Sequence, residues 1–75
     1  MNDVVIKKVG DTIVSERDIK IIERYSNGFN ASEIAREFKQ SVRTIEAAIA
    51  RLKSKFNCYT VVQLVAEFLR KELIK

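Results

Sequence analysis

The stretch of sequence that decides the fold is residues 30–56, NASEIAREFKQSVRTIEAAIARLKSKF. Its apolar residues recur at helical spacing in two segments, which are Ile34, Ala35 and Phe38 followed by Val42, Ile45, Ile49, Leu52 and Phe56. Only Lys39 and Gln40 join the two segments, a link short enough to hold two helices at a steep angle. A short helix, a tight turn and a longer helix are typical of a helix-turn-helix unit.

Capping signals outside this stretch delimit two further helices. Three pairs resemble capping boxes, which are Ser15 with Asp18, Asn30 with Glu33, and Thr60 with Gln63. Ser41 is a plain N-cap candidate, and Gly28 is a natural helix stop because it tolerates a left-handed backbone. The sequence therefore predicts helices at about 15–26, 31–38, 41–56 and 60–73. The first turns Ile19 and Ile22 inward, with Tyr25 and Ser26 as further candidates.

The leading residues 1–13 follow a different pattern. Short apolar runs at 4–6 and 12–14 flank Gly10 and Asp11, a pattern compatible with an irregular hairpin. Because an isolated hairpin is marginal in water, we expect residues 1–13 to be an arm or linker and 14–75 to be the folded domain. The expected fold class is all-α, a four-helix bundle that contains a helix-turn-helix and carries an extended N-terminal arm.

The composition argues against catalysis and metal binding. The chain has no histidine and one cysteine, Cys58, so neither an internal disulfide nor a metal-ligand cluster is expected. The commonest nucleophiles and general bases are correspondingly scarce, and we expect no enzyme activity and no cofactor. No apolar run approaches the roughly 20 residues that cross a bilayer, and no signal sequence is evident. We therefore expect no membrane partner and a cytoplasmic protein.

The positive charge is concentrated in one part of the chain. Residues 1–35, 36–56 and 57–75 carry net charges of −1, +4 and +1. Such a concentration suits a surface that faces phosphates, and it also suits an ordinary solvated helix face. Charge alone leaves both interpretations open.

A helical wheel of residues 41–56 indicates which side chains would meet DNA. The side opposite the apolar stripe holds Arg43, Ala47, Ala50 and Ser54. Arginine can read guanine and alanine can contact a thymine methyl group, so Arg43 and Ala47 are the leading base contacts. Glu46 could accept from a cytosine amine, but an ion pair with Arg43 or Arg51 is an alternative.

Several other residues are candidate phosphate contacts. Thr44 would donate its hydroxyl near a helix N-terminus, with ordinary first-turn capping as the alternative. Arg51 flanks the outward side, and Lys53 and Lys55 lie toward its rims, where a solvated face is the alternative. Asn30 is a helix cap first and a possible backbone contact second.

These blocks resemble the LuxR/GerE-type helix-turn-helix family. Residues 15–18, SERD, are similar to the family's Thr/Ser-x-Arg-Glu opening, and residues 28–35, GFNASEIA, to its Gly-Leu-Ser-Asn-Lys-Glu-Ile-Ala core. Residues 41–47, SVRTIEA, are similar to the start of its recognition helix, and residues 55–57, KFN, to its Lys-Leu-Gly or Lys-Leu-Asn. Residues 63–66, QLVA, fall where its fourth helix begins. The resemblance covers residues 14–74 without a gap.

The resemblance implies a four-helix domain that binds double-stranded DNA in transcription control. Members are commonly the C-terminal output half of a response regulator or quorum sensor, which would make a receiver or sensor domain a partner, and some are the domain alone. In the family the fourth helix usually forms a dimer, which agrees with the wide apolar arc of residues 60–73. The expected homodimer surface comprises Val61, Leu64, Val65, Phe68 and Leu69.

Some positions depart from the family pattern and keep other functions open. Ser32, Ala48 and Val61 stand where the family commonly has a phosphate-binding lysine, a histidine and an arginine. Ser32 therefore remains a weaker candidate for a DNA contact. One alternative is a protein-interaction or dimerisation module of the same fold with weakened DNA binding. Another is a domain like region 4 of a sigma factor, although the apolar fourth helix argues against it.

Overall fold

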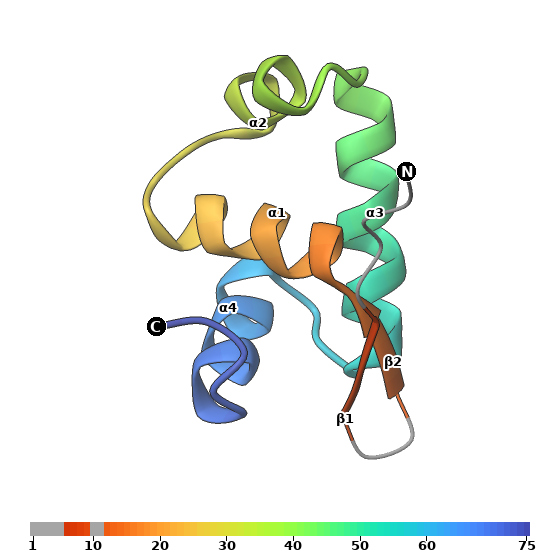
Figure 1. Ribbon diagram of the computed structural model, residues 1–75, viewed down its shortest axis with the longest axis vertical. Helices are drawn as coiled ribbons and strands as arrows, with labels where there is room; N and C mark the ends of the chain where they lie inside the picture. Colours follow the sequence, from red (N-terminus) through yellow and green to blue (C-terminus); the bar gives the residue numbers. More distant parts are fainter. Residues whose placement is uncertain (1–5, 10–11) are drawn as a thin grey trace.

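The computed structural model describes residues 6–9 and 12–75. Two short strands precede four helices, and α1 to α4 follow the predicted order (Figure 1). The elements are β1 (Ile6–Val9), β2 (Thr12–Ser15), α1 (Glu16–Ser26), α2 (Ala31–Phe38), α3 (Val42–Lys55) and α4 (Val61–Arg70). The four-helix, all-α prediction is confirmed, since the hairpin is the only β structure among the described residues.

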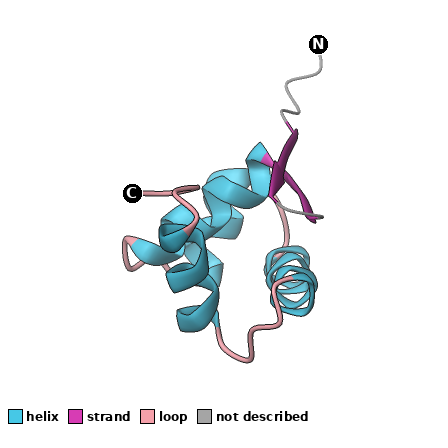
Figure 2. Ribbon diagram, turned by 90° about the horizontal axis from the view of Figure 1, so that it is seen from below, coloured by secondary structure: helices cyan, strands magenta, loops and turns pink. Residues whose placement is uncertain are grey.

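Strands β1 and β2 pair with each other in antiparallel register. Ile6 lies opposite Ser15 and Val9 lies opposite Thr12. This part of the predicted arm is thus a hairpin, while residues 1–5 and 10–11 lie outside the described residues. Val14 of β2 is fully buried in the core, so β2 is fastened to the helices. Figure 2 shows the hairpin leading directly into the first helix.

Each helix begins at the cap that the sequence predicts. Side-chain oxygens of Ser15, Asn30, Ser41 and Thr60 accept hydrogen bonds from backbone N–H groups three residues further on. The capping boxes of α2 and α4 are closed reciprocally. The box expected at α1 is half formed, because Asp18 supplies its N–H to Ser15 at 3.1 Å while its carboxylate binds elsewhere.

The helices also end alike, each followed by a residue with positive φ. These residues are Gly28, Lys39, Asn57 and Glu72. After α1, the N–H of Phe29 donates to the carbonyl of Arg24 and that of Gly28 to the carbonyl of Tyr25, which together make a Schellman motif. Helix α4 ends at Arg70, before the predicted residue 73, because Glu72 turns the chain and brings Ile74 back into the core.

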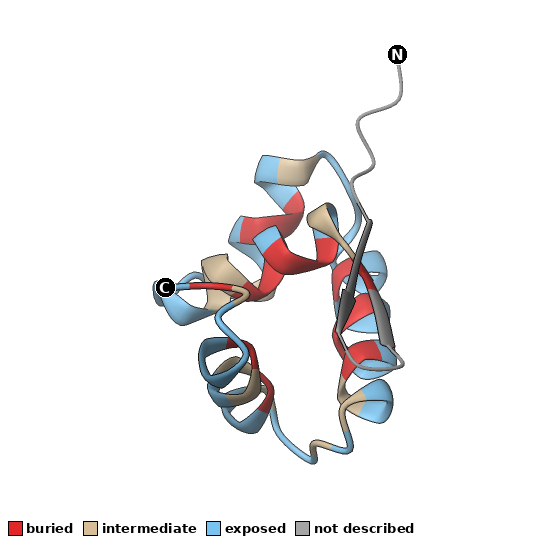
Figure 3. Ribbon diagram, turned by 60° about the horizontal axis from the view of Figure 1, so that its bottom comes forward, coloured by how far each residue is buried: buried red, intermediate tan, exposed pale blue. Residues whose placement is uncertain are grey.

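Helix α1 is the centre of the domain. It lies between α2 and α4 in Figure 1, with α3 upright beside its N-terminal end, and it contacts all three. Figure 3 shows, in red, the buried residues along the ribbons of α1, α3 and α4, and these residues belong to one hydrophobic core. Most predicted core positions are buried, but Val42 is 37% exposed and Ser26 is exposed, so the sequence assignment was wrong there. Ile21 and Ala48 are buried although the pattern did not select them.

Candidate nucleic-acid interface

A left-handed residue sets the angle between α2 and α3. Lys39 ends α2 with φ of 57°, and the N–H of Gln40 donates to the carbonyl of Ala35 at 2.9 Å. Ser41 then caps α3 by accepting from the N–H of Thr44 at 3.1 Å. The turn is therefore fixed by backbone and capping hydrogen bonds. Helix α3 leaves it with one side packed on the core and the other side in solvent.

The exposed side of α3 is the side that the helical wheel indicates. Arg43, Ala47, Ala50 and Ser54 are all exposed. The opposite side buries Ile45, Ala48, Ile49 and Leu52. Two small alanines between polar residues leave a narrow, low surface, which a helix needs if it is to lie deep in a groove.

The residues flanking this side differ in how they are engaged. Thr44 is exposed, and its Oγ1 lies 2.9 Å from Oγ of Ser41 within the cap. Lys55 is exposed and Lys53 is half-buried, and neither joins an ion pair among the described residues. Among the described residues, the cations of α3 that join no ion pair are therefore Arg43, Lys53 and Lys55.

Glu46 forms no ion pair with Arg43 or Arg51, the two partners offered as alternatives, within residues 6–9 and 12–75. Its carboxylate is exposed. Burial raises the pKa of the Tyr25 phenol, and the charge of Glu46 raises that pKa further. The negative charge of Glu46, on α3, thus lies close to Tyr25 at the end of α1.

The two candidates on α2 lie at its exposed first turn. The side chain of Asn30 accepts from the N–H of Glu33 at 2.9 Å, and the Glu33 carboxylate accepts from the N–H of Asn30 at 2.9 Å. Asn30 is therefore engaged as a cap. Ser32 is exposed beside it.

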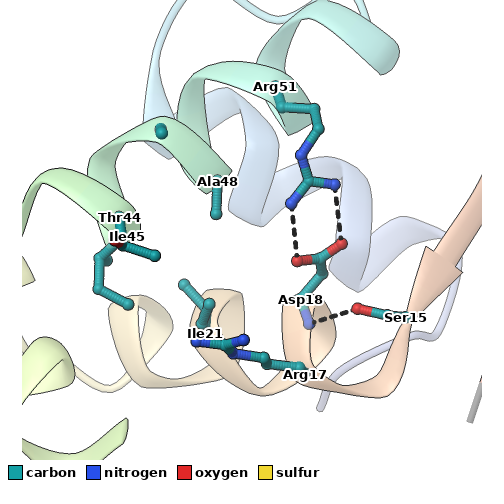
Figure 4. Close-up of a pocket in the computed structure, with 9 residues that line it drawn as sticks. Ser15, Arg17, Asp18, Ile21, Thr44, Ile45, Ala48 and Arg51 are labelled. Atoms are coloured by element: carbon teal, nitrogen blue, oxygen red, sulfur yellow. Dashed lines mark hydrogen bonds and ion pairs between the residues drawn. The ribbon is translucent and has the colours of Figure 1, made fainter. Parts of the chain in front are cut away.

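Arg51 lies across from α1 and is paired with Asp18. Its Nη1 and Nη2 donate to the two carboxylate oxygens of Asp18 at 3.3 and 3.2 Å (Figure 4). The Asp18 side chain is only 8% exposed, whereas that of Arg51 is 48% exposed. The pair ties the first turn of α1 to the last half of α3. Sequence reasoning missed this link, because it assigned Asp18 to its own helix cap.

A groove of about 550 Å³ separates α1 from α3. Its floor is apolar, formed by Ile21, Ile45 and Ala48, and its rims are polar except for Ala47 (Figure 4). The rim residues are Ser15, Arg17 and Asp18 on one side and Thr44, Ala47 and Arg51 on the other. Arg17 was not among the predicted site residues, although it stands in the SERD block that carries the family resemblance.

The apolar arc of α4 divides into a buried side and an exposed side. Leu64 and Phe68 are fully buried, so their assignment to a dimer surface was wrong: they face α1 and α3, and Phe68 packs edge-on against Phe56 with ring centroids 5.2 Å apart. Val62 is 74% exposed and Leu69 45% exposed. Val61 and Val65 are half-buried. A hydrophobic strip thus remains on the outer side of α4.

No cluster of three or more potential metal ligands occurs within the described part of the chain. Burial raises the pKa of the half-buried Cys58 thiol, which therefore stays protonated at neutral pH. None of the helices that the structure describes has both the length and the apolar character needed to span a membrane.

The paired helices, the tight turn and the exposed basic side of α3 define a helix-turn-helix DNA-binding domain. The family model described as "Bacterial regulatory proteins, luxR family" matches residues 12–68, and the chain belongs to this family. The match sets aside the sigma-factor alternative. The family consists of DNA-binding transcription regulators and not of enzymes. Neither the curated proteins nor the solved structures yielded a match.

Proposed function

We propose that the domain binds a specific duplex sequence by placing α3 in the major groove. The observation that carries this proposal is the exposed stripe of Arg43, Ala47 and Ala50 on the side of α3 directly opposite the core. Arg43 stands in the first turn, which is the part of a recognition helix that reaches base edges. Its guanidinium can donate to both acceptors of a guanine, and Ala47 can pack against a thymine methyl. Glu46 borders this stripe and could accept from a cytosine amine.

Phosphate contacts would come from the two flanks of α3 and from the start of α2. Lys53 and Lys55 supply charge, and Thr44 and Ser32 supply hydroxyl donors close to helix N-termini, where phosphates are favoured. Arg51 contributes less, because both of its terminal nitrogens already donate to Asp18. Asn30 contributes to DNA binding indirectly, by fixing the start of α2, since its side chain is engaged in the cap.

The proposal includes a homodimer formed by the outer side of α4. Val62 and Leu69 are exposed on this helix, and Val61 and Val65 lie half-buried next to them. Apolar side chains gathered on one surface commonly mark a partner site. Two copies joined there would address two half-sites about one helical turn apart, which compensates for the small recognition surface of one copy.

Selection from random duplexes, followed by titration of the preferred site, tests the proposal. The wild type is expected to bind duplex DNA with an affinity that falls steeply with salt, as phosphate contacts require. Arg43→Ala is expected to weaken binding to the preferred site by about 1–3 kcal/mol and to relax the preference there. Arg70→Ala is the matched control, because it removes the same charge from α4.

Lys55→Ala is expected to weaken binding to all duplexes alike and to flatten the salt dependence by about one phosphate contact. If Arg43→Ala and Lys55→Ala both bind like Arg70→Ala, α3 is not the DNA-binding helix. A wild type that binds no duplex at low salt but associates with itself would favour the interaction-module alternative.

A further inference from the structure

We propose that one DNA sugar-phosphate strand lies along the groove between α1 and α3, with Arg17 of α1 as a backbone contact. This inference rests on the proposed function, since it requires α3 to be the recognition helix. It adds α1 to the interface, a helix to which neither the sequence pattern nor the family resemblance assigned a DNA contact.

The groove lies next to the side of α3 that is proposed to face DNA. Thr44, Ala47 and Arg51 form its α3 rim, and Thr44 and Ala47 also belong to the DNA-facing part of that helix. When a helix lies in the major groove, the two flanking phosphate strands pass on its two sides. One of these strands therefore passes on the Thr44 and Arg51 side, where the opposite wall is the beginning of α1.

The two rims of the groove carry side chains that can bind a phosphate. Arg17 is exposed and joins no hydrogen bond or ion pair among the described residues. The single carboxylate on the rims, that of Asp18, is already covered by Arg51. The groove consequently presents the guanidinium of Arg17, the outer edge of Arg51 and the Thr44 hydroxyl. This combination suits a phosphodiester anion.

The floor of the groove carries no charged group that would repel the strand. Ile21, Ile45 and Ala48 are apolar, and the small side chains of Ala47 and Ala48 keep the groove open beside α3 (Figure 4). The floor side chains are themselves buried, with Ile45 and Ile21 0% and 1% exposed, so an approaching strand would contact the rims and the exposed Ala47 rather than the floor. Figure 4 shows the Arg17 side chain lying along α1 near Ile21, on the α1 side of the groove.

Titration of the preferred duplex with Arg17→Ala, Arg17→Lys and Lys20→Ala tests this inference. Lys20 is the matched control, because it is exposed on the same helix but does not line the groove. Arg17→Ala is expected to lower the affinity roughly three- to tenfold and to reduce the salt slope by about 0.9, the loss of one phosphate contact. Arg17→Lys is expected to recover most of the affinity and most of the salt slope. Lys20→Ala is expected to resemble the wild type. Thermal unfolding of each variant verifies that it is folded.

A set of duplexes with one methylphosphonate at each position, which removes one phosphate charge at a time, locates the contact. At the phosphate bound by Arg17, the substitution should weaken the wild type but cause no further loss in Arg17→Ala. Equal behaviour of Arg17→Ala and Lys20→Ala, in a protein whose Lys55→Ala variant does lose affinity, would overturn the inference and leave the proposed function intact. Loss in neither Arg17→Ala nor Lys55→Ala would instead overturn the proposed function.

Discussion

Asp18 in the first turn of α1 accepts two hydrogen bonds from the guanidinium of Arg51 in α3, at 3.2 and 3.3 Å. The carboxylate is nearly buried, so it needs a partner to compensate for lost hydration. Arg51 is half exposed and provides that partner while keeping part of its side chain in solvent. The pair therefore positions α3 against α1, in addition to any role of Arg51 toward DNA.

The first prediction concerns the stability supplied by this pair. Arg51→Ala leaves the Asp18 carboxylate buried without a partner and is expected to lower the free energy of unfolding by about 1–3 kcal/mol. Lys55→Ala removes the same charge from a solvated site and is expected to change it by less than about 0.5 kcal/mol. Urea unfolding measures both. In the double variant Asp18→Asn with Arg51→Ala, much of the loss should be restored; identical unfolding curves for the two single variants would contradict the prediction.

A second prediction separates the two sides of α4. Val62→Glu places a charge on the most exposed large apolar residue of the helix and is expected to keep the monomer folded while preventing self-association. Leu64→Ala opens a cavity in the core and is expected to cost about 2–5 kcal/mol of unfolding free energy. Sedimentation at micromolar concentration and thermal unfolding give the two readouts. A wild type that stays monomeric, both free and on palindromic DNA, would refute the dimer.

The third prediction is a pH dependence from the link between α1 and α2. Arg24 donates from Nε to both carboxylate oxygens of Glu37 at 3.0 Å and from Nη2 at 2.7 Å. These hydrogen bonds lower the pKa of Glu37 below its ordinary value of 4.5. A lowered folded-state pKa stabilises the fold above the unfolded pKa, and this contribution disappears as the pH falls through the folded pKa.

Thermal unfolding as a function of pH measures this effect. The wild type should lose melting temperature below about pH 4.5, and Glu37→Gln should begin lower at neutral pH and decline less steeply on acidification. Glu67, whose pKa is also lowered, chiefly by Lys71, remains in both proteins and sets the residual slope. Parallel curves for the two proteins would show that the Arg24 link contributes nothing.

A fourth prediction concerns the end of α1. Gly28 has φ of 93°, and a Cβ built there would meet nothing within 4 Å. Gly28→Ala is therefore expected to cost about 1 kcal/mol from backbone strain alone. Gly28→Asn should cost less, because asparagine tolerates the left-handed region better. Chemical denaturation of the three proteins gives the order, and an alanine variant as stable as the wild type would contradict it.

The helices could be predicted because their signals are local. Ser41 caps a helix whatever surrounds it, and the 3-4 spacing of Ile45, Ile49 and Leu52 defines a buried side without knowledge of the partner. The end of α4 could not be predicted in this way. The apolar pattern continues to Leu73, and only the left-handed Glu72 and the return of Ile74 to the core stop the helix at Arg70.

The candidate site was predictable on α3 and not between helices. The exposure of Arg43 and Ala47 follows from helix periodicity, whereas the pairing of Arg51 with Asp18 depends on how α3 crosses α1. The same limit explains the errors on α4. Periodicity shows that Leu64 and Phe68 share a side, but the packing of α1 and α3 decides that this side is the inner one.

Ser15 is both the last residue of β2 and the N-cap of α1, so no hinge residue separates the hairpin from the helix. Turning the hairpin about this point would break the hydrogen bond between Ser15 Oγ and the N–H of Asp18 and would pull buried Val14 out of the core. The hairpin and α1 are thus expected to move as one rigid unit. A molecule that binds the hairpin and shifts it would therefore also shift Asp18 at the start of α1. Because Asp18 is paired with Arg51, that shift would be passed on to α3.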